Sequence, residues 1–110
     1  MKRLSEYRIM WVLVFFDLPV TDKKDLKEYT TFRKFLLEDG FNMFQFSFYM
    51  RSCASNENAI VHVKRIKSNL PTHGKVGILC VTDKQFASME IFYGAKSQPT
   101  DKGWTQLELF

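Results

Sequence analysis

Cysteine is scarce in this chain of 110 residues, and its spacing excludes several classes of protein. Cys53 and Cys80 form no CxxC pair and belong to no cluster of cysteines and histidines, so neither a disulfide framework nor a zinc site is expected. Charged residues interrupt the N-terminus, which therefore does not have the pattern of a signal peptide. These absences predict a reduced, cytoplasmic setting.

Long apolar runs are also missing. The longest, residues 9–16, is far shorter than the roughly 20 residues that cross a bilayer, so no membrane partner is expected. The length and the apolar content of 45% suit one domain with one core. Eleven phenylalanines are more than a small monomer readily buries, which favours an oligomer, and the net charge of +4 favours a polyanionic partner.

The run IMWVLVFFD, residues 9–17, is the most informative stretch of the chain. As a strand it is apolar on both faces, with Trp11, Leu13 and Phe15 on one face, so both faces need cover. Pro19 cannot donate to a continuing ladder, which places Asp17 at the rim of the sheet, where functional sites concentrate. Alternatively, Asp17 only starts the turn or caps the next helix.

Two amphipathic helices are expected after this strand. The first runs from a cap at Asp22 to about residue 39, ends at Gly40, and buries a stripe of Leu26, Tyr29, Phe32, Phe35 and Leu36. The second opens at Ser55 or Asn56 and ends at Pro71. Its predicted inward side chains are Ala59, Ile60, Val63, Ile66 and Leu70.

Further strands are expected between and after the helices. NMFQFSFYMR, residues 42–51, alternates like a single strand with Phe44, Phe46, Phe48 and Met50 in the core. KVGILCVT, residues 75–82, is another strand, and KQFASMEIFY, residues 84–93, is a short helix leading into a strand. This order predicts an α+β fold, a ferredoxin-like split βαβ sandwich whose antiparallel sheet carries two helices on one face.

The predicted domain covers residues 1–93, followed by a linker and a C-terminal edge strand over residues 94–110. The sheet face without helices favours a homodimer. WTQLELF is expected to add to an edge of the partner protomer or of another protein, although an edge strand within its own domain remains open. Its predicted partner-binding residues are Trp104, Leu107, Leu109 and Phe110.

Charge on the two helices predicts a nucleic-acid surface. Basic side chains on one outer layer meet phosphates without reading bases, although a merely solvated helix face would look the same. The candidates are Lys23, Lys27, Arg33 and Lys34 on the first helix and Lys64, Arg65 and Lys67 on the second. Arg33 lies beside Tyr29 on the helical wheel, so it is expected to be half-buried with its head near Asp17.

Asp17 is the candidate metal ligand. Mg²⁺ takes one or two carboxylates together with water and phosphate, so two Asp17 side chains that meet across a dimer axis would suit one ion. Asp22 and Asp25 belong to a helix start, where carboxylates are ordinary. His62 and His73 have no partner at metal-ligand spacing and are expected to be solvated or structural.

Five runs together carry a resemblance to a known family. They are VFFDLP, FRKFLLEDGF, MFQFSFY, GKVGILCVTDKQFASM and the terminal QLELF. Over nearly the whole chain, the sequence resembles the second CRISPR-associated (Cas) protein of the adaptation pair, in its variant from systems with a Cas9-type effector. The resemblance implies a ferredoxin-like homodimer in CRISPR spacer acquisition. It also implies that the dimer bridges two dimers of the CRISPR integrase subunit and supports spacer-precursor DNA.

The resemblance also implies magnesium-dependent nuclease activity on RNA or DNA. Asp17 then becomes the catalytic metal ligand, and Arg33 and Phe48 the further family positions, with Gln45 and Ser47 in place. Phe16 departs from the family, in which many members have tyrosine before the aspartate.

Two alternatives belong to other classes. An RNA-recognition module that binds single strands without catalysis is suggested by DGFNMFQFSFY, but Asp39 stands where a basic residue is wanted, and phenylalanines packed on the helices could not stack on bases. A regulatory domain for a small molecule would need a polar or glycine-rich pocket, and none is visible in the sequence.

Overall fold

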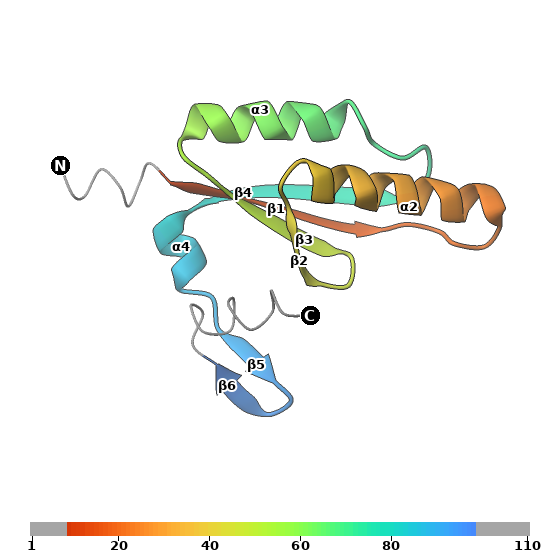
Figure 1. The fold of residues 1–110 in the computed structure, drawn as a ribbon. Helices are drawn as coiled ribbons and strands as arrows, with labels where there is room; N and C mark the ends of the chain where they lie inside the picture. The colour runs from red at the N-terminus through yellow and green to blue at the C-terminus, as the bar shows by residue number, and fades with distance from the viewer. Residues whose placement is uncertain (1–8, 99–110) are drawn as a thin grey trace.

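A four-stranded antiparallel sheet with two helices on one face forms the body of the protein. The computed structural model describes residues 9–98. The sheet has the order β2-β3-β1-β4, and α2 and α3 cover one face (Figure 1). The elements are β1 (Met10–Asp17), α2 (Lys23–Glu38), β2 (Asn42–Gln45), β3 (Phe48–Cys53), α3 (Asn56–Lys67) and β4 (Lys75–Thr82). This βαββαβ order confirms the predicted α+β, ferredoxin-like fold.

β1 lies at the centre of the sheet and is apolar on both faces, as predicted. It pairs antiparallel with β3 on one side and β4 on the other. Val12, Val14 and Phe16 point into the main core beneath α2 and α3. Trp11 belongs to a second cluster on the opposite face. The central strand therefore joins two separate apolar clusters.

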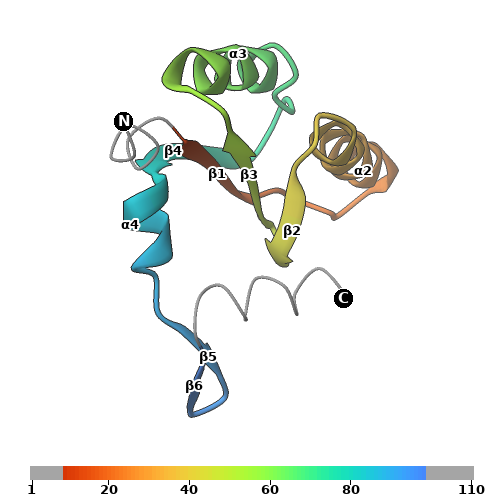
Figure 2. The ribbon, with the colours of Figure 1, turned by 60° about the vertical axis from the view of Figure 1, so that its left-hand side comes forward.

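A short helix, α4 (Asp83–Ala87), closes one end of the face that was expected to be open. It lies on the side of the sheet opposite α2 and α3 (Figure 2). Phe86 stacks on Trp11 with ring centroids 3.9 Å apart, and Trp11 Nε1 donates a hydrogen bond to Asp83 Oδ1 at 2.7 Å. At the other end of this face Phe15 remains 45% exposed.

The prediction of a single strand over residues 42–51 is wrong, because this run is a β-hairpin. β2 and β3 pair antiparallel around a turn at Phe46 and Ser47, and Ser47 adopts a positive φ of 63°. Neither turn residue is the glycine or asparagine that usually marks such a turn, so the apolar alternation hides it. The predicted core face is confirmed for Met50, which is buried in the cluster opposite the helices, and is wrong for Phe46, which is exposed. Tyr49, predicted on the outer face, is buried beneath the helices.

Both helix starts and the end of α2 agree with the sequence, whereas α3 ends at Lys67, before the predicted stop at Pro71, and the buried stripes agree only in part. Asp22 and Ser55 cap α2 and α3 through their side chains, and Gly40 follows α2 with a φ of 91°. An added Cβ at Gly40 would meet the side chain of Arg51. Three side chains predicted to face inward are exposed. Leu26 and Ile60 are exposed because the helices bury narrower stripes than their apolar residues suggest, and Leu70 is exposed because it lies beyond the end of α3.

A second small sheet reaches into the segment predicted as a linker. β5 (Ile91–Tyr93) pairs with β6 (Lys96–Gln98), so residues 94–98 form a turn and a strand. The short helix followed by a strand over residues 84–93 is confirmed. The domain boundary after residue 93 stays a prediction. The expected C-terminal strand, with Trp104, Leu107, Leu109 and Phe110, lies outside the described residues.

An ionic cluster joins the end of α2 to α3. His62 is 4% exposed and structural rather than solvated, and its Nδ1 donates to Asp39 Oδ2 at 2.7 Å. Arg65 Nη1 donates to Asp39 Oδ1 at 2.8 Å. Burial raises the pKa of the Asp39 carboxyl, but the hydrogen bonds from His62 and Arg65 outweigh burial and hold this pKa below its ordinary value. Ionised Asp39 therefore stabilises the fold.

Asp39→Asn is expected to lower the free energy of unfolding by about 2 kcal/mol at pH 7. Because the pKa is lower in the folded state, this contribution is present above the unfolded pKa of about 3.9 and is lost as the pH falls through the folded pKa. Urea unfolding between pH 7 and pH 3 measures it. The exposed Glu38→Gln is the control, and a difference from wild type that does not shrink below about pH 4 would contradict the assignment.

Candidate functional site

A groove at the rim of the sheet brings Asp17 together with the hairpin turn. It has a volume of about 370 Å³. The end of β1, the β2–β3 turn and the start of β4 supply its walls. Its lining residues are Phe15, Phe16, Asp17, Gln45, Phe46, Ser47, Phe48, Lys75, Val76 and Gly77. The end of the first strand, where the sequence predicted a site, therefore lines a groove.

Three features of the backbone build this groove. The amide of Phe16 donates to the carbonyl of Ser47 at 3.1 Å, which holds the hairpin turn beside the end of β1. Asp17 lies opposite Lys75 in the register of β1 and β4, so a carboxylate and an ammonium share one end. Opposite Phe15 stands Gly77, where any Cβ would collide with the Phe15 ring.

The donor atoms of the groove fit a hard cation. Asp17 supplies an exposed carboxylate, Gln45 an amide oxygen and Ser47 a hydroxyl, and oxygen ligands of this kind suit Mg²⁺. Within residues 9–98, no group of three or more histidine, cysteine or acidic side chains is arranged to hold a metal ion. Water, a phosphate or a second copy of the chain would have to complete the coordination.

Some of the other residues that the resemblance singled out line the groove, and one belongs to the core. Phe48, Gln45 and Ser47 line the groove with Asp17. Arg33 is half-buried, as predicted, but it interacts with the phenol of Tyr49 and is not part of the groove wall. Burial raises the pKa of Tyr49, and the charge and hydrogen bond of Arg33 oppose this rise. Arg33 therefore supports the core beneath α2.

All seven basic candidates, Arg33 included, belong to the two helices that cover one face of the sheet. Lys23, Lys27 and Lys34 are exposed on α2, and Lys64, Arg65 and Lys67 are exposed on α3. Of these, Arg65 pairs with Asp39. These exposed cations therefore lie on the two helices, on the side of the sheet opposite the apolar strip.

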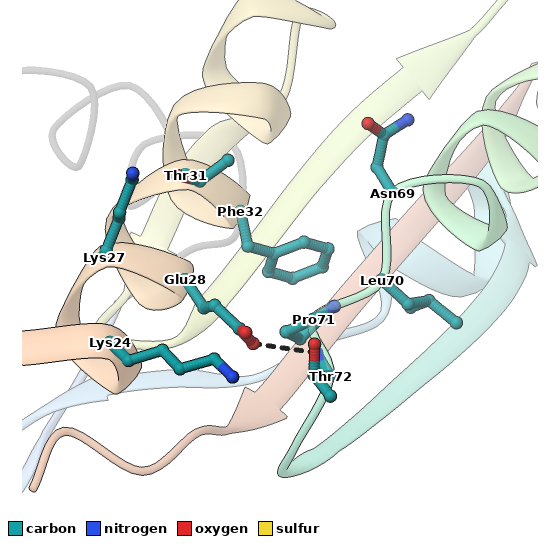
Figure 3. A pocket seen from close by; sticks show the side chains of 9 residues that line it. All are labelled: Lys24, Lys27, Glu28, Thr31, Phe32, Asn69, Leu70, Pro71 and Thr72. Carbon is teal, nitrogen blue, oxygen red and sulfur yellow. Dashed lines mark hydrogen bonds between the residues drawn. The ribbon is translucent and has the colours of Figure 1, made fainter. Parts of the chain in front are cut away.

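A second hollow lies between α2 and the connection from α3 to β4 (Figure 3). Its volume is about 380 Å³, with Lys24 and Lys27 along the α2 side and Leu70 on the connection. The carboxylate of Glu28 accepts a hydrogen bond from the amide of Thr72 at 2.8 Å, and this bond lowers the pKa of Glu28. This contact ties the connection to α2. Among the described residues, Glu28 and the two lysines are the charged groups that line the hollow.

Sequence reasoning missed two residues of the groove, Lys75 and the exposed Phe46. The sequence marks Lys75 only as the first residue of a strand, and its place beside Asp17 follows from a register that the sequence does not state. The apolar alternation predicts Phe46 in the core, because it conceals the turn. One signal was available: Phe46 is followed by Ser47, and serine between two apolar runs can mark a turn.

Comparisons with known proteins match the part of the chain that contains the groove and the helices. A sequence model of the family described as "CRISPR associated protein Cas2" matches residues 10–89. A protein of Flavobacterium psychrophilum is 60% identical over 98% of this chain and 94% of its own length. A protein of Parvibaculum lavamentivorans is 52% identical over 92% of this chain and its own whole length. Both are named CRISPR-associated endoribonuclease Cas2.

The family match spans every element from β1 to α4 and includes the groove and both helices. None of the helices within residues 9–98 has the length and hydropathy of a membrane span. The association with a Cas9-type effector stays a prediction. The chain belongs to the Cas2 family of CRISPR-associated proteins.

Proposed function

We propose that this protein is a homodimeric, DNA-binding subunit of CRISPR spacer acquisition. It bridges two dimers of the integrase subunit and supports spacer-precursor DNA. Membership of the Cas2 family supports the pathway. The observation that carries the proposal is the separation of two surfaces, a basic layer on the helices and an apolar sheet face on the other side. The C-terminal residues 104–110 remain the predicted contact with the integrase or the partner protomer.

The apolar face supports the dimer. Leu79 on β4 is 52% exposed and lies opposite Leu13, and Phe15 is exposed next along the same face. α4 covers only the Trp11 end. A continuous apolar strip on a sheet face marks an interface, and pairing this strip with itself gives a closed, two-fold contact.

Leu79→Asp is expected to convert dimers to monomers, because an unpaired charge would have to be buried at the centre of the contact. Light scattering across a concentration series measures the change. Ile60→Asp is the matched control, since Ile60 is 45% exposed on the helical side. Dimers that persist in the Leu79 variant, with its circular dichroism unchanged, would place the interface elsewhere.

The basic layer supports binding to the phosphate backbone. Its lysines form no ion pair within residues 9–98, so their charge is available, and cations on a helical surface contact phosphates without reading sequence. A dimer through the opposite face would double this layer and leave it uncovered. Affinity for duplex DNA should therefore fall steeply with salt.

Combined Lys27→Ala, Lys34→Ala and Lys64→Ala substitutions are expected to flatten the dependence of log affinity on log salt by roughly 0.9 for each phosphate that is no longer neutralised. Fluorescence anisotropy with a duplex at several salt concentrations gives the slope. Lys84→Ala, an exposed lysine on α4 across the sheet, is the control and should leave the slope unchanged. An unchanged slope in the triple variant would show that the helical layer does not bind the DNA.

A second activity, magnesium-dependent cleavage of a phosphodiester, is favoured by the oxygen donors around Asp17. The relatives' name, endoribonuclease, points to RNA as the substrate. A bound Mg²⁺ supplies Lewis-acid stabilisation of the phosphate and a more acidic water. In the chain itself, Asp17 would hold the cation, Lys75 would attract the phosphate, and Gln45 and Ser47 would orient the nucleotide that carries this phosphate.

Asp17→Asn is expected to abolish magnesium-dependent cleavage of RNA while sparing duplex DNA affinity, because an amide is a poor ligand for Mg²⁺ and the helical lysines are untouched. Cleavage is assayed with and without Mg²⁺. Asp22→Asn is the matched control, since asparagine caps α2 as well as aspartate does and Asp22 is not part of the groove wall. Full cleavage by the Asp17 variant would show that this carboxylate does not hold the catalytic metal.

The RNA-recognition alternative makes a different prediction for the same assays. The objection that its phenylalanines pack on the helices does not hold, because Phe44 packs with the cluster on the opposite face and its ring lies 5.5 Å from that of Phe48. A module of that class would bind single strands and show no cleavage in any variant. Membership of the Cas2 family favours the scaffold with a nuclease groove.

A further inference from the structure

Phe46 at the tip of the β2–β3 hairpin has no role in the core. It is 79% exposed, more than any other large apolar side chain among the described residues. Turn positions favour glycine, asparagine, aspartate and serine, so a phenylalanine there adds nothing to the turn. Within residues 9–98 its ring does not stack on the neighbouring aromatic side chains, which pair with one another instead. An exposed ring of this kind is available to a ligand.

The position of Phe46 is nevertheless fixed by the backbone around it. The hydrogen bond from the Phe16 amide to the Ser47 carbonyl, 3.1 Å long, anchors the turn to the central strand. The pairing of Gln45 with Phe48 closes the hairpin on both sides of Phe46. The backbone of Phe46 is therefore held at the wall of the Asp17 groove by a short turn and not by a long loop.

The groove has charged, aromatic and polar parts, and these suit the phosphate, the base and the sugar of a nucleotide. Asp17 and Lys75 form a charged end that suits a phosphate with a cation. Phe46 is the exposed aromatic part of the wall, whereas Phe15, whose ring centroid lies 6.0 Å from that of Phe48, belongs to the strip proposed for the dimer and is not assigned to the nucleotide. Gln45 and Ser47 lie among these residues and offer donors and acceptors to a base edge or a sugar hydroxyl. The volume is that of a small-molecule site.

We propose that Phe46 is a base-stacking residue, and that the groove takes one unpaired nucleotide with its base on Phe46 and its phosphate toward Lys75 and Asp17. Aromatic side chains stack on any base that has left its helix, so the contact tolerates sequence but requires an unpaired base. The inference rests on the proposed cleavage at Asp17, for which it names how the substrate is held. The helical layer would bind a duplex independently of this contact.

The test uses a ten-nucleotide RNA with one central 2-aminopurine, whose fluorescence is quenched when the base stacks. Binding is measured without Mg²⁺, so that no strand is cut. Wild type is expected to quench the probe on binding, and Phe46→Leu to lose the quenching and bind about tenfold more weakly. Phe46→Trp is expected to restore both, because it restores an aromatic face. A DNA strand of the same sequence and label shows whether binding depends on the 2′-hydroxyl of the sugar. Quenching with RNA alone, or with both RNA and DNA, supports stacking.

Two controls separate stacking from a general loss of apolar surface. Phe92 on β5 is 55% exposed and is not part of the groove, so Phe92→Leu should leave quenching and affinity unchanged. A duplex without unpaired bases should bind equally to wild type and Phe46→Leu. Equal quenching by wild type and Phe46→Leu would overturn the proposal. So would a change from dimer to monomer in the Phe46→Leu variant, since the ring would then belong to the protein interface.

Failure of this inference can be told apart from failure of the nuclease proposal. If Asp17 holds no catalytic metal, wild type will not cleave RNA with Mg²⁺, but quenching that depends on Phe46 will persist. If stacking is wrong, Phe46→Leu will cleave with unchanged KM and quench the probe as wild type does. If both hold, Phe46→Leu raises KM for a single strand, whereas Asp17→Asn abolishes cleavage and keeps the quenching.

Discussion

The central strand of this protein must be covered on both faces, and most of the architecture answers that requirement. α2 and α3 bury Val12, Val14 and Phe16 on one side, and α4 covers Trp11 on the other. Since a strand buried on two faces cannot lie at the border of a small sheet, it takes the middle position between β3 and β4. What remains uncovered is the stretch around Phe15 and Leu79, and this stretch is the surface for which a second copy is proposed.

The same constraint places the groove. β1 ends at Asp17 because Pro19 follows, and the hairpin turn reaches that end through the bond between Phe16 and Ser47. The catalytic carboxylate and the stacking ring that we propose therefore come from segments that are separate in sequence but tied by one backbone hydrogen bond. The basic layer is built on the opposite side of the sheet, so binding of duplex DNA and of an unpaired nucleotide use different surfaces.

Sequence reasoning reached the fold and the position of Asp17 but not the composition of the groove. Caps at Asp22 and Ser55, the stop at Pro19 and the two-sided apolar run are local signals, and each was confirmed. The turn at Ser47 uses a positive φ without glycine, so alternation concealed it and predicted Phe46 in the core instead of at the surface. Lys75 joins Asp17 through strand register, which depends on the packing of the whole sheet.

The central position of the first strand also has a consequence for how the chain folds as it is made. β1 is synthesised before the other described elements, yet its pairing with β4 and the contact of Trp11 with Asp83, 72 residues later, need almost the whole described chain. Contacts so distant in sequence slow folding, because a large loop must close before they stabilise anything. Until then an apolar run without charge is exposed on the nascent chain, where it is a natural site for chaperone capture and for aggregation.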